Sequence, residues 1–239
     1  MKIKNNFTRM ILCIIVLVAT LLMMLNCDRV VVDIDNRKIQ IADQKIKVRN
    51  INQYPNLPTG CESVAATMVL NYYGDRVSSE EFASCWLECS PICVDNGTQY
   101  CTDPNEAFIG DPFSEYSYGC YPPVIEKAIN INSPYCHAEI ITGMTLEELC
   151  YNYIDYNQPM LVWVTMRMSE PCEGESWYLP DGSYYTWTSG EHCMVLVGYN
   201  DDYYFFNDPL VGRTVAYEKW LCEQRFEEMG SRALFVTEC

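Results

Sequence analysis

The feature that most constrains this chain is a cysteine at the point where a loop runs into a helix. Pro55 and Pro58 exclude helix before Thr59, because proline restricts its own backbone and that of the residue before it. Thr59 and Glu62 have the spacing of a capping box, and apolar residues follow at helical intervals. The pattern therefore predicts that Thr59 caps a buried helix and that Cys61 lies on its first turn.

A thiol at that position has a defined chemistry. The free backbone N–H groups and the positive end of the helix dipole favour an anion, so we expect the pKa of Cys61 to be lowered. The thiolate is the nucleophilic form of cysteine, which suits covalent catalysis. The alternative is that Cys61 is one half of a disulfide or a small core residue, and position alone leaves both interpretations open.

Residues 1–27 have the pattern of a targeting segment. Three basic residues precede an uncharged apolar run at 10–25, which is typical of a secretory signal peptide or an N-terminal membrane anchor. A lipoprotein signal at Cys27 also stays open. We expect residues 28–47 to form a stalk or N-terminal strands, and residues 48–239 to form a domain that is extracellular or at the cell surface.

The chain is strongly acidic, with 32 Asp and Glu against 16 Lys and Arg and a formal net charge of −16. All of the acidic residues follow Cys27. Such a surface repels nucleic-acid phosphates and anionic lipid, so we expect no nucleic-acid partner. We interpret the charge as a source of solubility at the cell surface.

The 14 cysteines fit an oxidising compartment, because a count this high is unusual in a cytosolic enzyme. Residues 85–120 hold five of them among Pro, Gly, Asn and Asp, and no periodicity survives there. We interpret this stretch as a loop-rich insertion stapled by disulfides. Cys85, Cys89 and Cys93 are spaced by fours, whereas zinc sites usually show closer Cys-x-x-Cys pairs, so we expect neither a metal nor a cofactor.

The cysteine count also predicts which thiols are free. If Cys61 is a nucleophile it is unpaired, and Cys193, inside an apolar strand, is then a buried free thiol. Ten cysteines remain after Cys27, and we expect them to form five disulfides. One of these is expected to join Cys222 to Cys239.

Hydrophobic periodicity predicts helices first and an antiparallel sheet later, which is an α+β architecture. An Asp-Gly pair between β-forming residues also indicates a hairpin at 176–190. The expected helices lie at 59–74, 78–87, 122–131, 145–156 and 218–229, and the expected strands at 159–166, 192–199, 203–207, 213–217 and 232–237.

A cysteine nucleophile needs a base, and the chain has only two histidines. His192 begins an apolar strand, and a turn returns the next strand so that Asp208 falls near it. A carboxylate there would orient the imidazole and stabilise its charged form. Gln53, on the loop before Cys61, carries an amide that can donate to a developing oxyanion. The rival base, His137, has no carboxylate in a comparable strand setting.

These residues resemble a known family. The pattern Gln-x-Pro-x-Leu-Pro-x-Gly-Cys-Glu-Ser-Val-Ala, followed by His-x-x-Val-x-Val-Gly-Tyr and Asn-Asp-Pro, is similar to the C39-like cysteine peptidases, which are related to bacteriocin-processing peptidase domains. The match is close over 48–74 and 191–212. The resemblance implies a papain-like fold with Cys61 as nucleophile, His192 as base, Asp208 as orienting acid and Gln53 as oxyanion donor.

Three functions stay open at this point. The first is an extracellular thiol peptidase acting on a peptide or protein substrate, as the resemblance implies. The second is a thiol acyltransferase or amidase that uses the same triad on the same fold. The third is a non-catalytic surface module held by disulfides, with Cys61 among them. The aromatic stretch 177–187 is expected to line a substrate groove or to belong to the sheet core.

Overall fold

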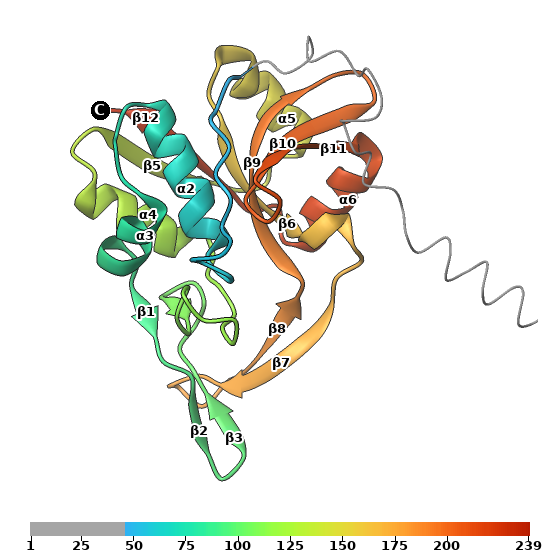
Figure 1. The fold of residues 1–239 in the computed structure, drawn as a ribbon. Helices are drawn as coiled ribbons and strands as arrows, with labels where there is room; N and C mark the ends of the chain where they lie inside the picture. The colour runs from blue at the N-terminus through green and yellow to red at the C-terminus, as the bar shows by residue number, and fades with distance from the viewer. Residues whose placement is uncertain (1–45) are drawn as a thin grey trace, which may run out of the picture. The chain divides into compact units, whose positions relative to one another are not determined.

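The computed structural model describes residues 46–239 (Figure 1). The predicted leader at 1–27 and all but the last two residues of the predicted stalk lie outside this range. Within 46–239, no helix is both long and apolar enough to span a bilayer.

The centre of the fold is a six-stranded sheet in which every neighbouring pair is antiparallel. The predicted strands are the apolar runs that build it. Strand β6 is buried at all six positions, so both faces of the sheet are covered at its middle. The spatial order is β11 (Arg213–Glu218), β10 (Tyr203–Asp208), β9 (Glu191–Tyr199), β6 (Met160–Thr165), β12 (Ala233–Glu238) and β5 (Cys136–Ile141).

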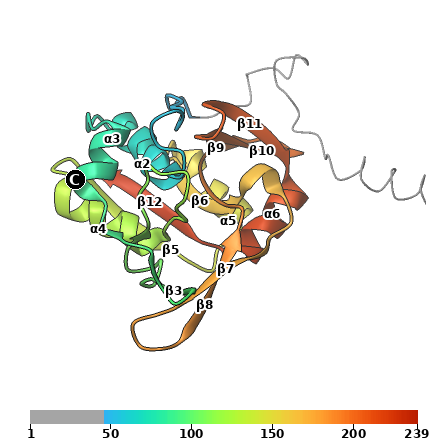
Figure 2. The ribbon, with the colours of Figure 1, turned by 60° about the horizontal axis from the view of Figure 1, so that its bottom comes forward.

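Helices cover the two faces of this sheet. In Figures 1 and 2, α2 (Cys61–Tyr72) and α4 (Pro122–Asn132) lie on one side, and α5 (Leu146–Asn152) and α6 (Lys219–Glu228) lie on the other. Helix α2 packs against β9 and β6, so the start of α2 is held beside the start of β9. The shorter helical segments are α3 (Ser79–Glu81), a π-helical turn (Phe82–Trp86) and two 3₁₀ turns (Ile154–Tyr156 and Met166–Met168).

Two of the three predicted helix caps are confirmed. The Ser78 side chain accepts from the Glu81 backbone N–H, and Thr145 and Glu148 form a full capping box. The predicted cap at Thr59 is wrong, because α2 begins at Cys61 with Gly60 in the cap position and no side-chain cap.

The residues of the Thr59 capping box are engaged elsewhere. The Thr59 hydroxyl donates to the Ser114 carbonyl at 2.9 Å, so it joins the loop to a distant segment instead of closing the helix. The Glu62 carboxylate lies inside the protein, where it accepts from the neighbouring Cys61 thiol and from the distant Cys120 backbone N–H.

Residues 85–120 contain short strands that belong to two smaller sheets. The strands β1 (Cys89–Ser90) and β4 (Phe108–Ile109) form a parallel pair. A hairpin of β2 (Cys93–Asp95) and β3 (Thr98–Tyr100) joins the predicted Asp-Gly hairpin in a four-stranded sheet. The Asp-Gly hairpin itself consists of β7 (Cys172–Tyr178) and β8 (Tyr184–Ser189), with Gly182 at a positive φ of 85° in its turn.

The prediction of five disulfides is wrong for this structure. All twelve cysteines of the described range are free thiols, so residues 85–120 are held by strand pairing and aromatic packing instead of disulfide staples. Cys61 and Cys193 are both free, as predicted, and Cys193 is buried as expected, but Cys61 is buried as well.

The predicted pairing of Cys222 with Cys239 fails for a topological reason. Strand β12 pairs with β5 at the edge of the large sheet, and the Cys239 backbone N–H donates to the Tyr135 carbonyl at 2.9 Å. That pairing carries Cys239 to an exposed position next to Cys136, whereas Cys222 is completely buried on α6.

Candidate active site

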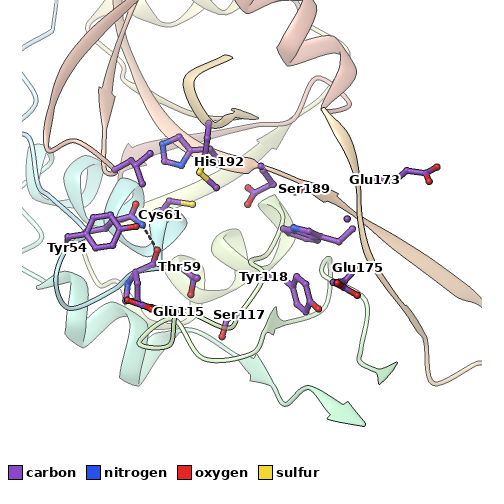
Figure 3. A pocket seen from close by; sticks show the side chains of 18 residues that line it. Tyr54, Thr59, Cys61, Glu115, Ser117, Tyr118, Glu173, Glu175, Ser189 and His192 are labelled. Carbon is purple, nitrogen blue, oxygen red and sulfur yellow. Dashed lines mark hydrogen bonds between the residues drawn. The ribbon is translucent and has the colours of Figure 1, made fainter. Parts of the chain in front are cut away.

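The start of α2, the start of β9 and the end of β10 meet at a cavity of about 550 Å³. Gln53, Cys61 and His192 all line it, together with residues of the segment after β4 and of the β7–β8 hairpin. Figure 3 shows Cys61 beneath His192 at one end of the cavity, with Tyr118 and Glu175 at the other. The structure therefore brings together three of the four residues predicted from sequence, and the fourth, Asp208, touches His192 from behind.

Cys61 is buried and free, and its sulfur has two hydrogen-bond partners. The thiol donates to Glu62 Oε2 at 3.2 Å, and the Cys193 backbone N–H donates to Cys61 Sγ at 3.5 Å. Because Cys193 follows His192 on β9, the second contact ties the start of α2 to the strand that carries the histidine.

The electrostatic setting of Cys61 is the opposite of the one predicted. Burial raises the pKa of the Cys61 thiol well above its usual value of 9.0, and the nearby carboxylates of Glu62 and Glu191 raise it further. The hydrogen bond from Cys193 lowers this pKa, but it is the smaller effect. The expectation that the helix N-terminus would lower the pKa of Cys61 is therefore wrong, because burial and the two carboxylates raise it.

Two buried glutamates, Glu62 and Glu191, lie beside the thiol, and the sequence analysis assigned neither of them a role in the site. Glu62 Oε1 accepts from the Cys120 backbone N–H at 2.6 Å, while Glu191 Oε1 is buried without a hydrogen-bond partner among the described residues. Burial raises the pKa of both carboxyl groups, and Glu62 raises that of Glu191 further. The available signal was a glutamate next to Cys61 and another next to His192, each at the edge of an otherwise apolar run.

His192 is oriented by a carboxylate, as the sequence predicted. Its Nε2 lies 2.7 Å from Asp208 Oδ1, and both side chains are almost completely buried. The Leu210 backbone N–H also donates to Asp208 Oδ1 at 2.8 Å, which fixes the carboxylate. With the Nε2 proton donated to Asp208, the other ring nitrogen, Nδ1, is left as an acceptor. In residues 46–239 no hydrogen bond joins Cys61 directly to His192.

Gln53 is held at the cavity by its neighbours on the loop. Its backbone N–H donates to the Pro209 carbonyl at 2.9 Å, and its side-chain amide donates to the Pro58 carbonyl at 2.7 Å. The first bond ties the loop before α2 to the turn that follows Asp208. An amide nitrogen carries two N–H groups, so one remains to donate into the cavity.

Two other polar residues, the rival base His137 and the neighbour of Asp208, take no part in this arrangement. His137 is an exposed residue of β5, paired with Thr237 of β12, and it does not line the cavity. Asn207, beside Asp208, is fully buried and bonded to the Val48 carbonyl and the Thr214 hydroxyl, so it is not available to His192.

Aromatic residues form one wall of the cavity. Trp187 and Tyr118 line it, and their ring centroids are 5.9 Å apart. Trp177 is completely buried behind them, 4.9 Å from Tyr118. The two interpretations of the aromatic stretch 177–187 therefore both hold, since one tryptophan faces the cavity and the other belongs to the core.

Comparisons with known proteins identify a family and a relative that this chain is similar to. A model of the Peptidase C39-like family matches residues 45–234. YvpB of Bacillus subtilis strain 168, an uncharacterised protein, is 27% identical over 185 residues, which are 76% of this chain and 70% of YvpB.

Two solved structures are similar as well. The crystal structure of a candidate C39-like peptidase from Bacillus anthracis has a TM-score of 0.68 and 28% identity, over 81% of this chain and 96% of its own. The peptidase domain of Streptococcus ComA, a bifunctional ABC transporter of a quorum-sensing pathway, has a TM-score of 0.48 and 13% identity, over 80% of this chain and 98% of its own. The TM-score of the ComA domain is too low to support an inference. The similarity to the Bacillus anthracis structure confirms the predicted papain-like α+β fold.

Proposed function

Because the chain belongs to the Peptidase C39-like family, we propose that it hydrolyses peptide bonds with Cys61 as its nucleophile. The observation that carries this proposal is the convergence of Cys61, His192 and Gln53 on one cavity, with Asp208 hydrogen-bonded to the far side of the imidazole. A nucleophile, a base, a group that orients the base and an amide donor are the parts that acyl transfer requires.

In the proposed reaction, His192 Nδ1 accepts the proton of the Cys61 thiol. The sulfur then attacks the peptide carbonyl, and the second Gln53 N–H donates to the oxygen that becomes negatively charged. His192 returns the proton to the leaving amine, which leaves a thioester on Cys61. Water, deprotonated by the same imidazole, releases the acid and restores the thiol.

The resting thiol is not yet in position for this step. Its S–H donates to Glu62, so the sulfur must turn from Glu62 towards His192 when a substrate enters. Asp208 supports the transfer because an ionised carboxylate at Nε2 stabilises the imidazolium that forms. The Trp187 and Tyr118 side chains offer an apolar wall for the substrate.

The same residues would pass an acyl group to an amine, so the test must identify the acceptor. We would incubate the full-length chain with a mixed peptide library, with and without a primary amine, and analyse the products by mass. Hydrolysis predicts free acids whether or not the amine is present, whereas dominant amide products would show an acyltransferase. Absence of any Cys61-dependent product would remove the proposal and favour a non-catalytic module.

A location outside the cell is proposed on different grounds, namely the targeting pattern at 1–27. Digestion of intact cells with an added protease would remove the domain if it lies on the outer surface, and would spare it if it lies inside.

A further inference from the structure

A compact set of metal-binding atoms lies at the floor of the cavity. The Cys61 sulfur, one carboxylate oxygen of Glu62 and one of Glu191 all lie within 4.8 Å of one another, and all three residues are buried. They come from two elements that pack together, because Cys61 and Glu62 open α2 and Glu191 opens β9. The set therefore depends on the fold and not on a local sequence motif.

Glu191 also carries an acceptor that no group in residues 46–239 satisfies. Its Oε1 is buried with no hydrogen-bond partner in this range, and Glu191 lines the cavity. The residues that line the cavity include no lysine or arginine. The nearest cation to interact with Glu191 is Arg232, whose guanidinium lies 3.7 Å from the centre of the Tyr121 ring and donates to the Met229 carbonyl.

A glycine lets the two carboxylates lie close to the segment that leads into α4. A side chain at Gly119 would place its Cβ 2.6 Å from Glu62 Oε1 and 3.0 Å from Glu191 Oε2, so both carboxylates approach the chain only because that position has no Cβ. Glu62 is held in place by the Cys120 N–H and by the Cys61 thiol.

We propose that Cys61, Glu62 and Glu191 bind a zinc ion. A thiolate with two carboxylates suits Zn²⁺, whereas Mg²⁺ and Ca²⁺ prefer oxygen ligands alone. Tetrahedral zinc holds a sulfur ligand and an oxygen ligand about 3.6 Å apart. The ligand atoms here lie within 4.8 Å of one another, so a sulfur and an oxygen need to approach by about 1 Å at most to bind one ion. On binding, the Cys61 proton leaves to solvent and a Zn–S bond forms, with the fourth zinc position left for water.

Zinc at this site would block the proposed nucleophile, a consequence that rests on the proposed function. A Zn–S bond would withdraw electron density from the sulfur and would place the ion between the sulfur and a substrate carbonyl. Bound zinc would therefore hold the peptidase in a reversible inactive state, from which a chelator restores the free thiol.

The test is alkylation of Cys61 by iodoacetamide in the full-length chain, mapped by mass spectrometry, with EDTA, ZnCl₂ or MgCl₂. At a zinc concentration tenfold above its dissociation constant, about one-eleventh of Cys61 should stay reactive. MgCl₂ should not protect it. Cys85 and Cys172 are exposed free thiols, and their alkylation in the same digest shows whether the added metal salt inhibits the reagent itself. Titration calorimetry with ZnCl₂ gives a second readout that does not depend on alkylation.

Two variants test whether zinc binds at the proposed site or acts on the protein in a less specific way. Glu191→Gln keeps the shape of the side chain and should lose the protection and weaken zinc binding at least tenfold, while Glu175→Gln, an exposed residue on the same cavity, should keep both. Equal zinc binding by wild type and Glu191→Gln, or equal protection by magnesium, would overturn the proposal. Protection of Cys61 in a protein that hydrolyses no peptide would uphold the metal site and remove only the proposed function.

Discussion

At the scale of single residues, the hydrogen bond between His192 and Asp208 is the strongest structural support for the proposed active site. A charged or polar side chain that is almost fully buried needs a partner, and each of these two residues supplies it for the other. The Leu210 N–H holds the carboxylate from the opposite side. His137 has no such environment, because it lies exposed on the edge strand β5.

The first prediction compares the two histidines. His192→Ala should lower kcat for peptide hydrolysis by about 10²- to 10⁴-fold, because it removes the proposed general base. His137→Ala should leave kcat unchanged and serves as the matched control. Steady-state kinetics on both variants, with circular dichroism to verify folding, would contradict the assignment if the two losses were equal.

The second prediction concerns the group that orients the base. Asp208→Asn should lower kcat without reducing it to background, because the carboxylate orients the imidazole and stabilises its charged form. The loss should be smaller than that of His192→Ala, since a neutral amide still offers an oxygen to Nε2. Wild-type kcat in this variant would place the orienting group elsewhere.

The third prediction follows from the raised pKa of Cys61. Alkylation requires the thiolate, so in EDTA the rate at Cys61 should keep rising as the pH increases beyond 9.0, the usual thiol value. Glu62→Gln should shift the profile to lower pH, because it removes a negative charge beside the sulfur. A plateau at or below neutral pH would instead indicate a thiolate–imidazolium pair in the resting protein.

At the scale of elements, the key link is between α2 and the segment that leads into α4. Glu62 accepts from the Cys120 backbone N–H, and the Trp163 indole of β6 donates to the Cys120 carbonyl at 2.9 Å. The backbone N–H and the backbone C=O of Cys120 therefore both have hydrogen-bond partners inside the protein. These two bonds fix this segment against the start of α2.

The fourth prediction tests that link. Gly119→Ala should lower the free energy of unfolding by about 1–3 kcal/mol, because its Cβ would overlap Glu62 Oε1 and press on Trp187. Gly182→Ala, at the tip of the β7–β8 hairpin, is the comparison: its Cβ would meet no neighbouring atom and only the positive φ of 85° would strain it, so it should cost less. Urea denaturation measures both, and equal values would show that Gly119 is not tightly packed.

Local signals in the sequence predicted most elements. The strands at 192–199 and 203–207 were found because continuous apolar runs mark buried strands, and the Thr145 and Ser78 caps because their spacing is local. The Thr59 cap failed because Thr59 binds Ser114, a contact over 55 residues that no local pattern contains.

The site itself was predictable only in part. Cys61, His192, Asp208 and Gln53 carried both a chemical reason and a resemblance, and the structure brings them together. The closeness of Glu62 and Glu191 could not be foreseen, because it depends on how α2 packs on β9. For the same reason the lowered pKa of Cys61 was a wrong expectation, since burial and two carboxylates outweigh a helix terminus.

At the scale of the whole molecule, the cavity depends on four separate parts of the chain. The loop before α2 supplies Gln53, and the large sheet supplies His192 through β9. The β7–β8 hairpin and the segment after β4 supply the aromatic wall, with Trp187 and Tyr118. The net charge of −16 and the Glu115, Glu173 and Glu175 side chains at the cavity make its surroundings acidic.

The central claim is that Cys61 is the nucleophile of this fold. The most direct measurement is labelling with an epoxysuccinyl probe in EDTA, followed by mass mapping, alongside peptide hydrolysis by wild type and Cys61→Ala. We predict that the probe modifies Cys61 in preference to the eleven other described thiols, and that Cys61→Ala loses both labelling and hydrolysis with an unchanged melting temperature. Full hydrolysis by Cys61→Ala, or labelling confined to other cysteines, would contradict the account.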